Sequence, residues 1–370
     1  LDGTLLRVEV ADGSPHFPSP RDYTSLAGTG RGLTLVDDSV DRWGVHIHGD
    51  GKLVWFEIRT TGGTSDAAEP RTGRPQRAVD DSDVTVRVEL LNVPLLMHAA
   101  WQEHAAALLR DYLLVQLDED PLALERHAEA SDALTVLHDQ LPAPSIDDAP
   151  DAIMATALEP HVSLETATLR VPRASVTHFQ TLDELLDQAV AAADAGRLLV
   201  PATQPEVQEM RTWLCGQVRD QSAVGAASPV PWEARTDIWQ PVHVSDFPDW
   251  DTRDVSASPV ALLATDESSV VVAVSPATLA LLGFRDAAEL VGRRVITIIP
   301  PRFRQAHLAG TTLHVVNGRS PLLGVRVTVP VLLADGGERL VELQIEPRHR
   351  SAGRKVFIAE FFPLQDEHAV

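Results

Sequence analysis

Three glycines at alternate positions near the start of the chain are the first residues whose spacing suggests chemistry. Gly28, Gly30 and Gly32 lie in the stretch GTGRGLTLVDDSVDRW, where residues without a Cβ would let the backbone approach a phosphate closely. The apolar, helix-periodic run that follows predicts a helix from about Leu33 to Arg42, whose amino end would direct free amide groups at that phosphate. The same spacing also occurs in ordinary tight turns that lead into helices, so the pattern leaves both interpretations open.

His307 is the second candidate, in the stretch RFRQAHLAGTTLHVVNG near the carboxyl end. This stretch predicts a helix, on which His307 and His314 share one face because they are seven residues apart. An imidazole on that face could ligate a haem iron. A structural or surface histidine is the alternative, because ligation needs supporting residues as well as the ligand itself.

The net charge disfavours some partners. The chain of 370 residues has 53 acidic and 31 basic side chains, a formal charge of −22, which opposes binding to nucleic acid or to an anionic membrane. A small group of arginines, Arg293, Arg294, Arg302 and Arg304, is expected to be a solvated helix end. Cys215 is the only cysteine, which rules out an intramolecular disulfide and a thiolate zinc cluster.

The sequence contains no signal-peptide pattern and no apolar stretch of membrane-spanning length, so we expect a cytoplasmic location. Nearly all basic residues are arginine, and Ala, Val and Asp are abundant, a bias typical of a GC-rich bacterial genome. The chain starts at Leu1 inside a predicted strand, which suggests a fragment.

The elements that must position these residues predict a multidomain α+β protein. Residues 1–59 combine a first strand, LDGTLLRVEV, with the glycine stretch and a hairpin around Gly49-Asp50-Gly51. Residues 60–83 carry Gly, Pro, Ser, Thr and charges without a period and are interpreted as a flexible linker. Residues 84–239 are expected to form a mainly helical domain for signal transmission or dimerisation, and residues 255–363 a domain built on an antiparallel sheet.

Four main helices are predicted in the middle segment, after a short strand, VTVRVELLNV. Helical periodicity predicts the first two at about 94–117 and 121–141. Thr181 and Thr203 each stand three residues before a glutamate, which is the spacing of a capping box and predicts the starts of two further helices. We expect a helical bundle, and a ligand pocket between its helices is the alternative.

The carboxyl-terminal segment shows two short apolar runs, several helical pieces and three further strands, with a hairpin turn at Asp335-Gly336-Gly337. This order predicts an antiparallel sheet with the helices on one face. Such an arrangement leaves a cavity between sheet and helices, the usual place for a small ligand. The residues predicted to line or fill it are apolar: Val270, Val272, Leu322, Val331, Leu333, Leu343 and Ile345.

The succession VEVADGSPHFP, the glycine stretch and GDGKLVWFEIR resembles the C-terminal part of the ATPase fold of histidine kinases and anti-sigma-factor serine kinases. The resemblance covers residues 5–59 and implies part of an α/β sandwich. In that family Asp12 would hydrogen-bond the adenine of ATP, and Gly28, Gly30, Arg31 and Gly32 would face the phosphates. The family's magnesium-binding Asn and catalytic Glu lie on a helix upstream of the first strand seen here. We therefore expect a vestigial nucleotide site and no catalysis by the chain as given.

The carboxyl-terminal segment is similar to PAS domains. The matching motifs are Ser258-Pro259, Ser275-Pro276-Ala277, LLGF at 281–284, ELVGR at 289–293, PPRFRQAH at 300–307 and Asp335-Gly336. The last helix also resembles that of oxygen-sensing haem PAS kinases, with His307 at the proximal-ligand position. Leu313 stands where that family has one of its arginines, and Arg326 is displaced by one residue from another. The segment has no cysteine, which excludes cysteinyl-adduct photochemistry.

Together these patterns predict a bacterial cytoplasmic signal-transduction protein: an incomplete ATP-binding module, a helical transmitter and a C-terminal PAS sensor. A ligand or partner would shift the population of PAS conformations, and the helices would transmit that shift. One alternative is a serine kinase, if the true start of the chain lies upstream. A second is a haem-based gas sensor acting through His307, and a third is an interaction scaffold. The expected partners are proteins of a signalling pathway and a second copy of the chain.

Overall fold

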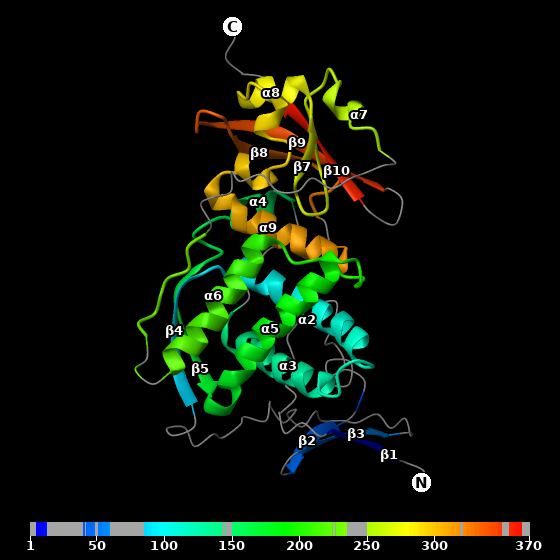
Figure 1. The fold of residues 1–370 in the computed structure, drawn as a ribbon, viewed down its shortest axis with the longest axis vertical. Helices are drawn as coiled ribbons and strands as arrows, with labels where there is room; N and C mark the ends of the chain where they lie inside the picture. The colour runs from blue at the N-terminus through cyan, green and yellow to red at the C-terminus, as the bar shows by residue number, and fades with distance from the viewer. Residues whose placement is uncertain are drawn as a thin grey trace, which may run out of the picture.

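A computed structural model of the chain shows three regions that follow one another along the long axis (Figure 1). The described residues are 5–12, 40, 42–48, 51–59, 85–142, 144, 150–223, 225, 227–234, 250–318, 321–349 and 355–364. Gly28, Gly30, Arg31, Gly32 and the predicted linker at 60–83 lie outside the described residues.

The amino-terminal region is a three-stranded antiparallel sheet in the order β1-β3-β2. Its strands are β1 (Leu5–Asp12), β2 (Arg42–His48) and β3 (Gly51–Arg59). The predicted hairpin is confirmed, because His48 pairs with Gly51. The predicted helix cannot extend to Arg42, because Val40 is already non-helical and Arg42 begins β2. Asp12 ends β1 and pairs with Lys52 in the backbone register.

The middle unit, residues 85–234, is a two-stranded antiparallel sheet against helices. Its elements are β4 (Thr85–Val93), α2 (Leu95–Gln116), α3 (Ala123–Gln140), α4 (Pro150–Thr156), β5 (Leu164–Pro172), η1 (Arg173–Ser175), α5 (Val176–Asp194) and α6 (Pro205–Ser222). The predicted strand and the two helices at 94–117 and 121–141 are confirmed. The sequence analysis missed β5, whose inward positions Ala167, Leu169 and Val171 alternate with polar residues.

Both capping-box predictions are wrong, although both helices exist. The helix expected from Thr181 begins at Val176, and the Thr181 hydroxyl instead donates to the Glu129 carboxylate at 2.8 Å. The residue preceding α6 is Gln204, not Thr203, and no side chain caps that helix end. A threonine followed by a glutamate at the right spacing therefore marked neither helix start here.

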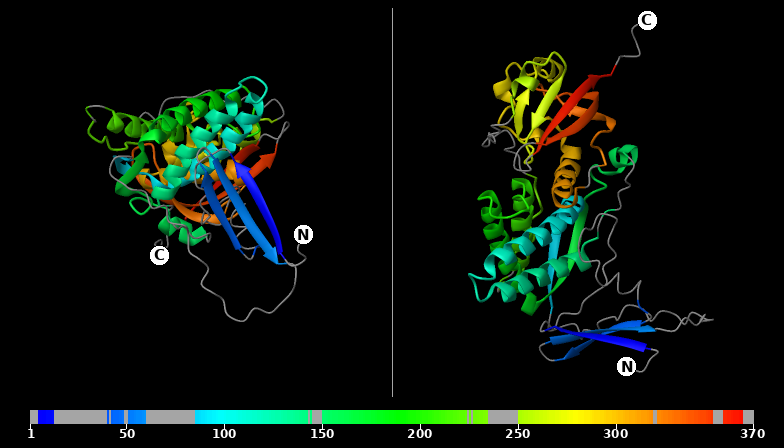
Figure 2. Two further views of the ribbon diagram at one scale, coloured as in Figure 1. Left: turned by 90° about the horizontal axis from the view of Figure 1, so that it is seen from below. Right: turned by 90° about the vertical axis from the view of Figure 1, so that its right-hand side faces the viewer.

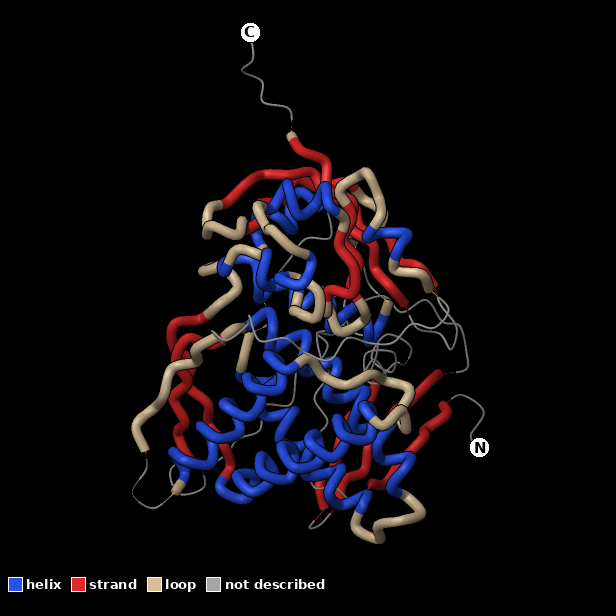
Figure 3. Tube along the Cα trace, turned by 45° about the horizontal axis from the view of Figure 1, so that its top comes forward, coloured by secondary structure: helices blue, strands red, loops and turns tan. Residues whose placement is uncertain are grey.

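The core of the middle unit lies between the two strands and helices α2, α3, α5 and α6. Its largest fully buried side chains include Trp101, Phe179, Leu182, Met210 and Leu214. Figure 3 shows these helices gathered beside the strand pair, below the carboxyl-terminal sheet. The same core also takes in Ile296 and Leu308, which belong to the carboxyl-terminal region.

The carboxyl-terminal region contains a five-stranded antiparallel sheet in the order β7-β6-β10-β9-β8, which confirms the five predicted strands. The elements are α7 (Arg253–Ser256), β6 (Leu262–Thr265), β7 (Val271–Val274), α8 (Pro276–Leu282), η2 (Ala287–Glu289), η3 (Val295–Ile298), α9 (Pro301–Asn317), β8 (Arg326–Leu332), β9 (Glu338–His349) and β10 (Lys355–Pro363). Ser275 caps α8, because its Oγ accepts from the Thr278 N–H at 3.2 Å.

The two faces of this sheet are covered differently. Leu263, Val271 and Val341 pack with Leu282 of α8 and Ile298 of η3 on one face, as the sequence predicts. On the opposite face, Ala264, Val272, Ala273 and Val356 pack with Trp250 and with Val255 of α7. The expectation that all helices gather on one face is therefore incomplete.

Helix α9 is the longest helix of this region, and it packs along α2 of the middle unit. Figure 2 shows it running beside α2, below the five-stranded sheet. Apolar contacts join the two helices: Leu96 and Ala100 of α2 pack with Ala309 and Leu313 of α9. Burial of each leucine contributes roughly 1.5–3 kcal/mol. The carboxyl-terminal region is thus held to the middle unit by its own helix.

Candidate functional site at the junction of α9 and the middle unit

The amino end of α2 is capped by a residue from a distant part of the chain. The first N–H groups of a helix have no partner within the helix, and Pro94 before α2 provides no side-chain cap. The Oε1 atom of Gln305, on α9, accepts from the Leu96 N–H at 2.9 Å and from the Met97 N–H at 3.2 Å. The carboxyl-terminal region therefore completes the first turn of α2.

The Nε2 group of Gln305 also forms hydrogen bonds. It donates to Ser163 Oγ at 3.0 Å and to the carboxylate of Glu159. The Glu159 N–H donates in turn to the Arg302 carbonyl at 3.0 Å. Gln305 is buried, and it uses both its acceptor and its donor to join α9 to two segments of the middle unit.

Arg294 forms the second polar connection. It lies just before η3 and is only 4% exposed. Its Nη2 group donates to Gln204 Oε1 at 2.6 Å and lies 3.1 Å from Glu206 Oε2. Glu206 is in the first turn of α6, where the helix dipole favours a negative charge. The pair is therefore a buried ion pair between the two regions, with the anion at a helix amino end.

Gln204 connects Arg294 to α9. Its Nε2 group donates to the Leu308 carbonyl at 3.2 Å and to Thr312 Oγ1 at 3.1 Å. The loop before Gln204 is fixed by His104, whose Nε2 lies 3.0 Å from the Pro201 carbonyl and whose Nδ1 lies 3.1 Å from Thr203 Oγ1. Burial lowers the pKa of His104, so the neutral ring is the stable form in this position.

His307 lies on α9 beside this polar network. Its Nε2 atom is buried and has no hydrogen-bond partner among the described residues. Burial and, to a smaller extent, the positive charge of Arg294 together lower the pKa of His307 to about 4. One helical repeat further on, the His314 ring contacts the Phe357 ring of β10 with centroids 5.4 Å apart. The shared face of these two histidines therefore points towards the sheet.

The predicted site residues are not brought together in the described part of the chain. Asp12 ends β1, His307 lies in α9, and the glycine stretch falls outside the described residues. The expected solvated arginine group is wrong for Arg294, which is buried. Arg302 forms an ion pair with Glu338 at 2.7 Å, and Arg304 Nε donates to the Ile299 carbonyl at 3.0 Å.

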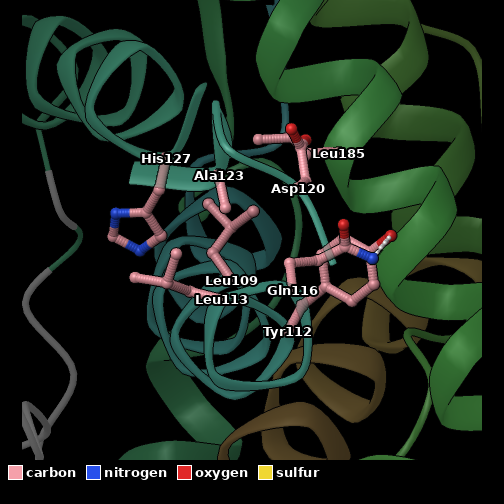
Figure 4. Close-up of a pocket in the computed structure, with 8 residues that line it drawn as sticks. All are labelled: Leu109, Tyr112, Leu113, Gln116, Asp120, Ala123, His127 and Leu185. Atoms are coloured by element: carbon pink, nitrogen blue, oxygen red, sulfur yellow. Dashed lines mark hydrogen bonds between the residues drawn. The ribbon is translucent and has the colours of Figure 1, made fainter. Parts of the chain in front are cut away.

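A small hollow lies at the other end of α2, between α2, α3 and α5. In Figure 4 Leu109, Leu113 and Ala123 lie near His127 on one side, while Gln116 donates to Tyr112 on the other at 2.9 Å. Its volume is about 10 Å³, roughly the space of one water molecule and far below that of a cofactor site. The predicted ligand cavity between the carboxyl-terminal sheet and its helices stays a prediction. Val331 and Val341 pack there with Leu282.

The described residues contain no group of three histidine, cysteine or carboxylate side chains placed to hold a metal ion. None of the described helices is long and apolar enough to cross a membrane. Cys215 is buried in α6, and burial raises the pKa of its thiol, so it is no reactive nucleophile.

Comparison with known proteins identifies the carboxyl-terminal region. The family model described as PAS fold matches residues 255–362. No curated protein matches the chain.

Several solved structures resemble the same region. The PAS domain of an HTR-like protein from Haloarcula marismortui is 19% identical, with 30% of this chain and 88% of that chain covered and a TM-score of 0.24. A LOV protein from Rhodobacter sphaeroides is 22% identical, with 32% and 66% covered and a TM-score of 0.25. The PAS domain of BvgS from Bordetella pertussis is 17% identical, with 30% and 82% covered and a TM-score of 0.23.

The sheet, its helices and the family match together define a sensor module. Residues 255–362 are a PAS domain. A PAS sensor domain implies that the protein acts as a sensor in signal transduction. The residues that connect this domain to the middle unit, Arg294 and Gln305, were not recognised as functional from the sequence. No sequence pattern pointed to Gln305, and Arg294 was noted only as one member of a group of arginines.

Proposed function

We propose that this protein is a signal-transduction protein in which the PAS domain passes its conformational state to the middle unit through α9 and Arg294. The observation that carries the proposal is the position of Arg294. The Val271 N–H donates to the Arg293 carbonyl at 2.8 Å, and the Val295 N–H donates to the Ser269 carbonyl at 2.8 Å. The backbone around Arg294 is thus bonded to β7 of the PAS sheet and its preceding turn, while its side chain pairs with Glu206 of α6.

A change in the PAS core that moves β7 would therefore move Arg294. Arg294 and Gln305 reach the amino ends of α6 and α2, two helices whose other ends lie far from the PAS domain (Figure 1). A ligand or partner that favours one PAS conformation would therefore shift the populations of the conformations that both helix ends adopt. The effect requires differential binding to the two conformations, and the ligand is not specified by this proposal.

The location of the protein, ATP binding and haem binding are proposals as well. A cytoplasmic location in a bacterium fits the residue composition and the charge of −22. ATP binding by Asp12 and the glycine stretch would make the chain an ATP-binding regulator. Haem binding through His307 would make it a gas sensor, which a Soret band that is lost in His307→Ala would support.

The coupling can be tested by hydrogen–deuterium exchange on the full chain. Leu290 is fully buried in the PAS core, so Leu290→Ala should loosen that core. We expect faster exchange not only there but also in peptides covering the first turns of α2 and α6. The same change made together with Arg294→Met should affect the α6 peptide much less. A peptide from the middle of α3, which does not contact the PAS domain, is the internal control.

The opposite result would be equally clear. If Leu290→Ala accelerates exchange in the PAS domain while both helix ends keep their wild-type rates, the two units behave independently. The proposed transmission through Arg294 would then be wrong.

A further inference from the structure

An exposed apolar patch surrounds the turn between α2 and α3. Leu114 and Leu117 end α2, Leu122 lies in the turn, and Leu124 begins α3. Their exposed fractions are 67%, 46%, 55% and 65%. Single exposed leucines are ordinary on protein surfaces, but four within eleven residues around one turn concentrate apolar surface in the way that interaction sites do.

The same stretch is strongly acidic. Between Leu114 and Glu125 the sequence contains four carboxylates and no basic residue. Asp120 pairs with Arg126 at 3.4 Å. Asp118, Glu119 and Glu125 are exposed and have no ion-pair partner among the described residues. The apolar residues are therefore bordered by three carboxylates without an ion-pair partner in the described part of the chain, and by one that pairs with Arg126.

The small hollow lies next to this patch. Leu113 and His127 line it, and both are within three residues of a leucine of the patch. Figure 4 shows Leu113, Ala123 and His127 on its apolar side. A hollow with room for about one water molecule is too small to hold an anchor side chain, so the exposed leucines themselves must supply the apolar contact.

We propose that the α2–α3 turn, with the four leucines and their carboxylates, binds an amphipathic helix of another protein that carries apolar residues on one face and Lys or Arg beside them. The negative border favours a basic partner and disfavours a second, equally acidic copy of this chain. A stable dimer interface needs on the order of 800 Å² on each side. A single helix laid on an apolar surface needs less.

The patch lies at the far end of α2 from the PAS contact. The helix has 22 residues, which corresponds to a length of about 33 Å. Binding at the patch does not depend on the coupling proposed above, so either proposal can fail alone.

A fluorescence-anisotropy titration of the full chain tests the proposal. The probe is a labelled model peptide of about 20 residues, long enough to form a helix, with leucines at every third or fourth position and lysines or arginines elsewhere. A scrambled peptide of the same composition is the comparison. We expect micromolar binding of the ordered peptide, and binding at least about tenfold weaker for Leu114→Ser/Leu124→Ser, because each lost apolar contact removes on the order of 1 kcal/mol.

A second variant tests the charge separately. Asp118→Asn/Glu119→Gln/Glu125→Gln should weaken binding several-fold at low salt, and the difference should shrink at high salt because exposed charges are screened. Leu340→Ser, at an exposed leucine of β9, is the matched control and should bind like the wild type. All substituted side chains are exposed, so circular dichroism should show unchanged folding.

Three results would overturn the proposal. One is no binding of the ordered peptide, and another is equal binding of the ordered and scrambled peptides or of the wild type and the leucine variant. The third is a wild-type dimer in light scattering that Leu114→Ser/Leu124→Ser converts to a monomer, because a second copy would then occupy the patch.

Discussion

The PAS core and the junction that connects it to the middle unit differ in where their buried polar side chains lie. Beneath α8 the sheet packs on buried apolar residues such as Val271, Leu290 and Val341, while the buried Ser275 and Thr278 bond locally at the start of that helix. The junction also contains apolar contacts, but its centre holds Arg294, Glu206, Gln204, Gln305 and Thr312, all buried.

This difference has a physical consequence. The stabilisation from apolar burial is roughly proportional to the buried area and does not depend on direction. It therefore favours burial of a surface but only weakly determines how two surfaces are aligned. Hydrogen bonds depend on direction and distance and weaken steeply with a shift of about 1 Å. We therefore expect the apolar core to supply stability within the PAS domain and the polar junction to fix one alignment of α9 on α2 and α6.

Two ion pairs in the same region sharpen the comparison. Arg294 and Glu206 are 3.1 Å apart with side chains 5% and 8% exposed, whereas Arg302 and Glu338 are 2.7 Å apart with side chains 41% and 37% exposed. The shorter distance belongs to the exposed pair. Solvent screening nevertheless makes an exposed pair a weak contributor, so burial, not distance, should decide which pair matters.

The largest effect is therefore expected from Glu206→Ala. It leaves the Arg294 guanidinium buried without its counter-ion, which typically costs about 3–5 kcal/mol of unfolding free energy. Glu338→Ala removes the acid of the exposed pair and should leave stability nearly unchanged. Urea denaturation of the full chain measures both.

The double variant Glu206→Met/Arg294→Met separates charge from packing. Replacing a buried ion pair by apolar residues of similar volume is often neutral or stabilising, so most of the loss should be recovered. A loss in the double variant as large as that of Glu206→Ala would show that packing, and not the unpaired charge, causes the effect.

The same contrast explains how much the sequence could predict. Strand alternation and helical periodicity depend on neighbours in the chain, and they predicted the five PAS strands and helices α2 and α3. The Oγ atom of Ser275 both caps α8 and accepts from the Leu262 N–H at 2.9 Å. A short polar side chain at a helix start is a local signal, so this role was within reach of sequence analysis.

The junction depends on partners far away in the chain. Gln305 contacts Leu96 and Met97 across more than two hundred residues, and no pattern within a window of sequence records that. The spacing of Thr203 and Glu206 suggested a capping box, yet Glu206 faces Arg294 instead. The spacing therefore identified Glu206 but predicted the wrong partner for its carboxylate.

A smaller effect is expected from Gln305→Leu. The substitution keeps approximate size but leaves the Met97 N–H buried without an acceptor and the Leu96 N–H with only the Val162 carbonyl at 3.3 Å, at a cost of about 1–3 kcal/mol. Hydrogen exchange of these two amides should accelerate more than that of the α2 interior. Gln344→Leu, which removes an exposed amide on β9, is the control and should change neither quantity. Unchanged exchange at Met97 would mean that Gln305 does not cap α2.

The smallest effect concerns pH and compares a histidine at the junction with one in the middle core. Burial lowers the pKa of His307 to about 4 and that of His98 to about 3. Unfolded histidines titrate near 6.5. As the pH falls from about 6.5 towards 4, these histidines bind protons in the unfolded chain but not in the folded chain. Stability is therefore full above pH 6.5 and falls on acidification, by about 1.4 kcal/mol per pH unit for each such histidine.

Urea denaturation of the wild type and of His307→Gln between pH 7 and pH 5 isolates the junction histidine. The carboxylates contribute equally to both proteins, so the difference between the two slopes belongs to His307. We expect the variant to lose less stability on acidification. Parallel curves would mean that His307 is solvated rather than buried. Arg294→Met should also flatten the slope, because the guanidinium charge contributes to the lowered pKa of His307. No comparable dependence on Arg294 is expected for His98, whose pKa is lowered by burial and by His138.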